Sequence, residues 1–334
     1  MRLALAAAAF LMPAAARASG FDYWLDKAHR ADRPDAKIEF YTNAIAAWTW
    51  ADGFANKTFA YKQRGSAYDD KKEYGRAIAD YGQAILLTPD DAAAYNDRGL
   101  AYKHNKQYDR AIADYGKAIA LDPSNAVTYY NRGLAYMNEM QYDQAIADYD
   151  QAVSLDPRYA AAYNNRGSAY LRQNERSRAI ADYDHAIGLN PRYADAYRNR
   201  GMAYMLSGKP EASVADFARA IDLDSGSAFG YQGLGFALFD KRDFRRAAKS
   251  FAKSLRVEKT ADSWGGLAMS LWAMGKKKKA LTAFGKAVKL EPAFAQGARA
   301  VLGKSGYSYT RNQALYLNKL AQATTDAASP SDSE

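Results

Sequence analysis

Six glycines are spaced 34 residues apart in this chain of 334 residues: Gly65, Gly99, Gly133, Gly167, Gly201 and Gly235. Other positions keep the same phase. Sixteen residues after each glycine the side chain is Tyr or Phe, and twelve residues after it the side chain is Ala in five of the six cases. A regular period of this length predicts similar units that stack on their sequence neighbours instead of folding around one central core.

The spacing of apolar residues divides each repeat into two helices. We expect Gly and Ala where the two helices cross, because only small residues let two backbones approach closely, and Tyr or Phe beside them. Four repeats carry a proline twenty-four residues after the glycine: Pro89, Pro123, Pro157 and Pro191. Proline lacks a backbone N–H and disfavours a helical conformation in the residue before it, so each second helix should end there.

The pattern resembles the tetratricopeptide repeat family, whose signature has aromatic, small and proline residues at fixed offsets. One repeat fills these positions with Tyr129, Gly133, Tyr136, Ala145, Tyr149, Ala152 and Pro157. The resemblance implies an all-α fold, an α-solenoid that winds as a right-handed superhelix of helix hairpins. Seven repeats are expected, at residues 58–91, 92–125, 126–159, 160–193, 194–227, 228–260 and 261–294. A degenerate repeat is expected at 19–57, capping helices at 295–323 and a disordered tail at 324–334.

Five repeats carry Arg immediately before the glycine, where the family usually has Leu: Arg64, Arg98, Arg132, Arg166 and Arg200. The same five carry Asp before the aromatic residue of the second helix: Asp80, Asp114, Asp148, Asp182 and Asp216. In the last two repeats both positions change together, to Leu234 with Ser250 and to Leu267 with Ala283. We therefore expect each Arg to pair with its Asp between the helices, whereas Asp91 should lie at the surface. The alternative is a row of arginines that binds acidic ligands.

The resemblance also implies a concave groove, lined by the first helices, that binds an extended peptide or a partner helix. The residues expected to face it are Lys62, Asp97, Tyr130, Asn131, Asn165, Arg198 and Asn199. The three Asn residues form a predicted ladder of amides that can donate to and accept from a peptide backbone. The alternative is that these amides bond to each other or to water. The family's two-carboxylate clamp is not matched, because Ser66 and Asp97 replace the expected Asn residues.

Positive charge is concentrated near the C-terminal end. The chain has a formal net charge of +9, and residues 241–304 hold 16 Lys and Arg against 4 Asp and Glu. The candidate basic patch consists of Arg242, Arg245, Arg246, Lys249, Lys253, Lys276, Lys277, Lys278 and Lys279. Such a patch attracts anionic lipid, nucleic acid or an acidic protein, and the alternative is a solvated face that aids solubility.

The first residues have the pattern of a secretory signal peptide. Arg2 is followed by an apolar stretch from Leu3 to Leu11, and the sequence Ala16-Arg17-Ala18 fits the cleavage rule. We expect residues 1–18 to be removed near Ala18 and the protein to be exported, with the periplasm as its expected location. An uncleaved anchor or an Ala-rich disordered start is the alternative. We do not expect an exported chain to bind nucleic acid.

The residues that usually carry enzyme chemistry are sparse. The chain has no cysteine, which excludes disulfides, thiolate metal ligands and a cysteine nucleophile, and its three histidines stand far apart. We expect no enzyme activity, no metal and no cofactor. The predicted function is a scaffold or adaptor that binds a protein or peptide, in cell-envelope assembly. The alternative is a peripheral binder of anionic membrane or polymer through the basic surface at 241–289. The sequence leaves the oligomeric state open.

Overall fold

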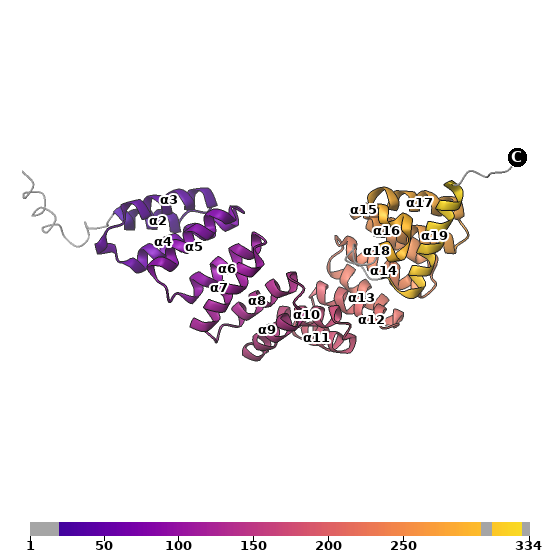
Figure 1. Ribbon diagram of the computed structural model, residues 1–334, viewed down its shortest axis with the longest axis horizontal. Helices are drawn as coiled ribbons and strands as arrows, with labels where there is room; N and C mark the ends of the chain where they lie inside the picture. The colour runs from indigo at the N-terminus through magenta and orange to yellow at the C-terminus, as the bar shows by residue number, and fades with distance from the viewer. Residues whose placement is uncertain (1–19, 302–308, 329–334) are drawn as a thin grey trace, which may run out of the picture. The chain divides into compact units, whose positions relative to one another are not determined.

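The computed structural model describes residues 20–301 and 309–328 (Figure 1). In these two ranges the chain is built from α-helices and short 3₁₀ turns, and it contains no β-strand. It divides into two compact units, which we call the N-terminal unit, up to Pro157, and the C-terminal unit, from Arg158. The predicted signal peptide and residues 329–334 of the predicted tail lie outside the described residues.

The N-terminal unit is a row of antiparallel helix pairs in which each pair packs on the next. Its elements are α2 (Gly20–His29), α3 (Pro34–Ala47), η3 (Trp50–Asp52), α4 (Phe54–Asp70), α5 (Tyr74–Leu87), α6 (Ala92–His104), α7 (Tyr108–Leu121), α8 (Ala126–Asn138) and α9 (Tyr142–Leu155). The degenerate repeat expected at 19–57 therefore forms a helix pair, α2 with α3, followed by the short turn η3.

The C-terminal unit continues the same arrangement and ends with additional helices. Its elements are α10 (Ala160–Arg172), α11 (Arg176–Leu189), α12 (Ala194–Leu206), α13 (Pro210–Leu223), α14 (Ala228–Asp240), α15 (Phe244–Val257), α16 (Ala261–Ala273), α17 (Lys277–Leu290), η4 (Pro292–Gln296), α18 (Ala298–Val301) and α19 (Arg311–Ala328). The predicted α-solenoid of helix hairpins is confirmed. Helix α19 continues to Ala328, so residues 324–328, which we expected in the tail, are helical.

The repeated glycine makes room for the aromatic ring of the second helix. A Cβ atom at Gly133 would lie 2.7 Å from Cε1 of Tyr149, and one at Gly99 would lie 2.8 Å from Cε1 of Tyr115. Both rings are fully buried. Because real Cβ atoms do not approach other atoms this closely, any larger residue would push the two helices apart.

Each Arg before the repeated glycine forms the predicted pair with Asp on the second helix. In the third repeat, Arg132 Nε donates to Asp148 Oδ2 at 2.8 Å and Arg132 Nη2 donates to Asp148 Oδ1 at 2.7 Å. The same two-point geometry joins Arg64 to Asp80, Arg98 to Asp114, Arg166 to Asp182 and Arg200 to Asp216. The Asp148 side chain is only 6% exposed. The hydrogen bonds that Arg132 donates to the Asp148 carboxylate raise the pKa of Arg132, so the guanidinium stays charged.

The same arginines also link neighbouring repeats. Nη1 of Arg200, which is not used by Asp216, donates to Asp184 Oδ1 of the preceding repeat at 2.6 Å. In the first repeat, Nη1 of Arg64 donates to Thr42 Oγ1 at 3.0 Å. Each arginine therefore holds its own hairpin closed, and at these two positions it also fixes the hairpin against the one before it.

Asp91 does not have the free surface position expected for it. Its side chain accepts from the backbone N–H of Ala94, which makes it the N-cap of α6, and it accepts from Lys62 Nζ at 2.8 Å. A cap of this kind typically contributes about 1 kcal/mol. Asp90 is exposed and forms no hydrogen bond or ion pair with the described residues, so it is the better reference for an unpaired surface carboxylate.

Helix α19, most of which falls in the segment 295–323 where capping helices are expected, packs against α14, α16 and α17. Leu317 and Leu320 of this helix are fully buried. The hydroxyl of Tyr309, two residues before α19, donates to the carboxylate of Asp262 at the start of α16. Because Tyr309 and Asp262 lie 47 positions apart in the sequence, no local sequence pattern contains their contact.

A partly buried carboxylate lies where α19 meets α14. Asp240, the last residue of α14, accepts from Thr310 Oγ1 at 2.9 Å, Gln313 Nε2 at 2.9 Å and Asn312 Nδ2 at 3.5 Å. Burial raises the pKa of Asp240 to about 6, although the three hydrogen bonds act in the opposite direction. We therefore expect the contact between α19 and the repeats to be sensitive to pH.

The Arg–Asp pair can be tested in the third repeat. We expect Asp148→Ala to lower the free energy of unfolding by about 3–5 kcal/mol, because it leaves the Arg132 charge partly buried without a partner. Thermal unfolding followed by circular dichroism measures this. Asp90→Ala is the control and should change the melting temperature little. The double variant Arg132→Met/Asp148→Leu should recover most of the loss, since no unpaired charge remains. Equal melting temperatures for Asp148→Ala and Asp90→Ala would contradict a buried pair.

The Asp240 contact predicts a pH-dependent stability. Its pKa is about 6 in the folded chain against 3.8 for an ordinary Asp, so the folded state holds this proton more tightly than the unfolded state. Stability from this group is therefore highest below pH 4 and falls as pH rises through 6. Between pH 4 and pH 7 the wild type should lose on the order of 1–3 kcal/mol relative to Asp240→Asn. Denaturant unfolding of both proteins at several pH values measures this difference in the free energy of unfolding. Altered hydrogen bonds in Asp240→Asn shift its stability by a constant amount, which cancels when the difference is compared between pH values. Parallel stability curves would show that Asp240 titrates normally.

Candidate functional site

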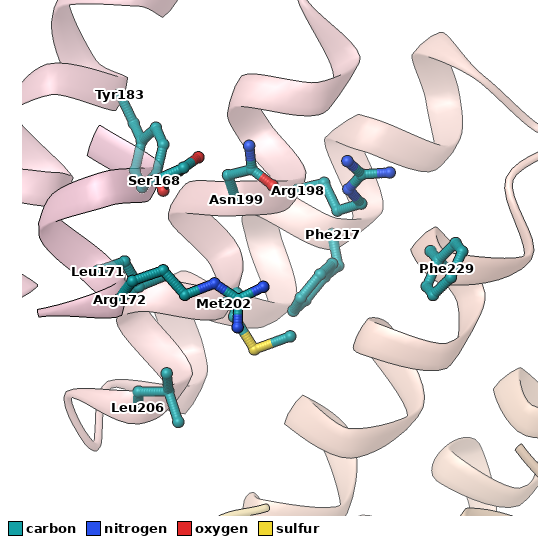
Figure 2. Close-up of a pocket in the computed structure, with 10 residues that line it drawn as sticks. All are labelled: Ser168, Leu171, Arg172, Tyr183, Arg198, Asn199, Met202, Leu206, Phe217 and Phe229. Atoms are coloured by element: carbon teal, nitrogen blue, oxygen red, sulfur yellow. Dashed lines mark hydrogen bonds between the residues drawn. The ribbon is translucent and has the colours of Figure 1, made fainter. Parts of the chain in front are cut away.

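A cavity of about 350 Å³ opens in the C-terminal unit among helices α10 to α14 (Figure 2). The residues that line it are Ser168, Leu171, Arg172, Tyr183, Arg198, Asn199, Met202, Leu206, Phe217 and Phe229. Most of them come from α10 and α12, which are the first helices of two successive hairpins. The cavity therefore lies on the face that the repeat pattern predicted to bind a partner.

Two fully buried rings form the fixed part of the cavity wall. Tyr183 and Phe217 occupy the aromatic position of their repeats and are held between the helices of their hairpins. The Tyr183 hydroxyl lies 3.2 Å from Ser168 Oγ, in hydrogen-bonding distance. Burial raises the pKa of Tyr183, so its hydroxyl is neutral at physiological pH. The wall is thus rigid and uncharged.

The rim of the cavity combines positive charge with exposed apolar surface. Arg172 is exposed and forms no ion pair with the described residues, whereas Arg198 pairs with Asp195 at 3.0 Å. Phe229 is 56% exposed although it is a large apolar side chain. Figure 2 shows Arg172 and Phe229 coming from opposite sides of the cavity. Cationic and aromatic groups around a concave site are suited to binding a segment that carries both carboxylates and apolar side chains.

The structure brings part of the predicted groove to this cavity. Arg198 and Asn199 line it, as expected from their position before the repeated glycine. Sequence reasoning missed Arg172 and Leu206, which lie five residues after the repeated glycine, and it missed Phe229. The available signal was helical spacing, because Arg172 follows the groove position of Ser168 by four residues on the same helix face.

The predicted asparagine ladder is bonded within the protein. Asn199 Nδ2 donates to Asn164 Oδ1 at 3.0 Å, and Asn131 Nδ2 donates to Asn96 Oδ1 at 3.3 Å. Asn164 in turn donates to Asn165 Oδ1 at 3.3 Å. Each of the three ladder amides therefore bonds to another Asn of the protein, and these contacts join none of the three directly to another ladder member. A peptide would compete for these groups or use the hydrogen-bonding capacity that remains.

The other predicted groove residues lie in the N-terminal unit and have neighbours of their own. The Lys62 ammonium is paired with Asp91, as described above. Asp97 is partly buried, and this burial raises its pKa. The ring of Tyr130 lies 6.0 Å from the ring of Tyr149, centroid to centroid. Of these three side chains, Lys62 links its repeat to the next one through Asp91. That the three contact a ligand stays a prediction.

The basic patch lies mainly on two second helices, α15 and α17. All nine predicted residues are exposed. Only Arg246 forms an ion pair with the described residues, at 3.6 Å from Asp243. Lys253 and Lys277 lie over the rings of Tyr231 and Trp272, with Nζ at 5.5 Å and 5.7 Å from the centroids. Arg242 departs from the rest, because it lies in the turn before α15 with a φ of 62°.

Across residues 20–301 and 309–328, no group of three or more His, Cys, Asp or Glu side chains is arranged to hold a metal ion. In the same part of the chain, no helix combines the length and the apolar character needed to cross a membrane.

The repeats match known family models. Models described as tetratricopeptide repeat match residues 126–159, 165–228 and 261–294, and one described as TPR repeat matches 65–106 and 104–139. Together they span more than half of the chain. None of the curated proteins matches it significantly.

Solved structures are similar in fold. A tetratricopeptide repeat protein from Parabacteroides merdae is 18% identical, with a TM-score of 0.59 over 79% of this chain and 98% of that chain. PilF from Pseudomonas aeruginosa is 21% identical, with a TM-score of 0.54 over 63% and 95%. The MamA protein is 32% identical, with a TM-score of 0.46 over 50% and 92%. The chain belongs to the tetratricopeptide repeat family and has the architecture of a protein-interaction scaffold.

Proposed function

We propose that the cavity in the C-terminal unit binds an extended segment of a partner protein, so that the chain acts as a non-catalytic adaptor. The partner contacts side chains of α10, α12 and α14, and the chain catalyses no reaction on it. We place this role in assembly of the cell envelope, because the first eighteen residues have the pattern of an export signal.

The observation that carries the proposal is the exposed apolar surface beside the cavity. Phe229 is 56% exposed, and Met202 and Leu206 are partly exposed next to it. When a partner covers exposed apolar groups around a cavity with fixed walls, binding is stabilised by about 25 cal/mol per Å² of buried apolar surface. A volume of about 350 Å³ is at the lower end of the range for binding pockets, so it accommodates a few side chains of a longer segment.

Crosslinking in the native cell envelope tests this proposal. We expect wild-type protein to capture a specific partner, and the variant Arg172→Ala/Phe229→Ala to lose it by about tenfold or more. Both side chains are exposed, so their removal should not unfold the chain, and circular dichroism checks this.

The matched control is Arg192→Ala/Leu86→Ala, which also removes one exposed arginine and one exposed apolar side chain. Leu86 is 73% exposed, and neither residue lines the cavity. Retention of the partner by the control and its loss by the cavity variant would support the site. Equal capture by all three proteins would exclude the cavity as the binding site.

The basic patch supports a second candidate function, peripheral binding to an anionic membrane or polymer. The specific observation is that Arg245, Lys249 and Lys276–Lys279 are exposed without an ion-pair partner among the described residues. Each such charge contributes about 1 kcal/mol to the binding free energy when it lies near an anionic lipid surface.

Vesicle co-sedimentation tests this second function. The wild type should pellet with phosphatidylserine-containing vesicles and not with pure phosphatidylcholine, and binding should weaken several-fold when salt is raised. Replacing Lys276–Lys279 by Ala should weaken it further. Binding that is equal for the two vesicle types, or unchanged in the variant, would count against a membrane role for this surface.

A further inference from the structure

A second cavity, of about 760 Å³, lies in the C-terminal unit where the cap helix α19 faces the ends of α12 and α14. We infer that it is a binding site for an acidic segment of a partner protein. This inference rests on the proposed function and adds to it the chemistry of the partner. The first cavity is built from repeat positions, whereas this one exists only because α19 folds against the repeats.

Four cationic side chains line this second cavity. Arg176 comes from the start of α11, Arg242 from the turn after α14, and Arg311 and Lys319 from α19. Arg242, Arg311 and Lys319 are exposed, and none of them forms an ion pair with the residues that the structure describes. Like charges gathered from three separate segments repel each other, and an anionic ligand relieves that repulsion.

The one carboxylate in the wall of the cavity offsets only part of the charge of these four cations. Asp240 accepts hydrogen bonds from the neutral groups of Thr310, Asn312 and Gln313. Since its oxygens are held by α19, it positions that helix instead of pairing with Arg242 or Arg311. The cavity therefore keeps an excess of positive charge.

Apolar side chains line the same cavity as the cations and favour a peptide over a small anion. Leu206 and Met205 at the end of α12, Tyr316 on α19, and Leu315, which is 51% exposed, line the same cavity. A lining that combines cations with apolar groups matches a segment that carries both Glu or Asp and apolar residues.

The two cavities share one residue and one sign of charge. Leu206 lines both of them, so the second cavity adjoins the first. Arg172 and Arg198 lie at the first cavity, and four further cations lie at the second. A single extended segment of a partner would meet positive charge along both cavities, with its apolar residues against Met202, Leu206 and Leu315.

Fluorescence anisotropy with two labelled octapeptides tests the inference on the full chain. One peptide alternates Glu with Leu, and the other alternates Lys with Leu. We expect the Glu/Leu peptide to bind at least tenfold more tightly than the Lys/Leu peptide. The variant Arg242→Ala/Arg311→Ala should weaken binding of the Glu/Leu peptide by about tenfold, because it removes two of the lining charges.

The control variant is Lys117→Ala/Arg192→Ala, which lowers the net charge equally but changes two exposed cations that lie outside both cavities and outside the basic patch. It should bind the Glu/Leu peptide nearly as well as the wild type. The inference is overturned if both variants weaken binding equally, since general charge attraction would then explain the result. It is also overturned if the Glu/Leu peptide binds no more tightly than the Lys/Leu peptide.

The outcome separates this inference from the proposed function. In one outcome, Arg172→Ala/Phe229→Ala loses the captured partner and the Glu/Leu peptide is not preferred. This result would keep the first cavity as the binding site and would reject an acidic partner. In the other outcome, the Glu/Leu peptide is preferred through Arg242 and Arg311, and Arg172→Ala/Phe229→Ala still captures the partner. This result would place binding at the second cavity, beside α19, alone.

Discussion

The close approach of the two helices in each hairpin is the constraint on which the rest of this structure depends. At Gly133 the missing side chain leaves just enough space for the ring of Tyr149, which is fully buried. This contact fixes the distance between helices, and the fixed distance lets Arg132 reach Asp148 with two hydrogen bonds. The 34-residue period of the sequence is therefore the period of one steric contact, and the ion pairs are built upon it.

The repeats hold together by two different means. Around Tyr81, Tyr115 and Tyr183 the buried apolar clusters are small, with two alanines beside each ring, and the Arg–Asp pairs add charge-assisted bonds to them. In the last two repeats the pairs are absent, and one continuous apolar cluster extends from Met205 to Ala321 of α19. Leucine replaces arginine where a large core becomes available, so the paired change seen in the sequence marks a change in the source of stability.

The sequence predicts what depends on near neighbours in the repeat. The helix pairs follow from the 3.6-residue spacing, and the contact of Arg with Asp sixteen residues later follows from their joint change along the chain. The contacts of Asp240 with Thr310 and Gln313 could not be predicted, because they join residues about 70 positions apart outside the repeat pattern. Arg242 illustrates the same limit. Its place in the sequence assigns it to a basic patch, whereas the fold places it in a cavity beside α19.

The first cavity lies where the aromatic position changes from Tyr to Phe. In the earlier repeats the Tyr ring is closest to the glycine of its own hairpin, as for Tyr149 and Gly133. The ring of Phe217 instead lies closest to Gly233 of the next hairpin, and Gly233 stands where the preceding repeat has Asn199. Loss of the tyrosine hydroxyl and of the amide removes two polar groups from this part of the groove. The part of the wall formed by Phe217 is apolar, and the charges that could orient a partner stay on the rim, at Arg172 and Arg198. Departures from the repeat pattern at Phe217 and Gly233 thus coincide with the surface that we propose for binding, while the constant positions maintain the scaffold.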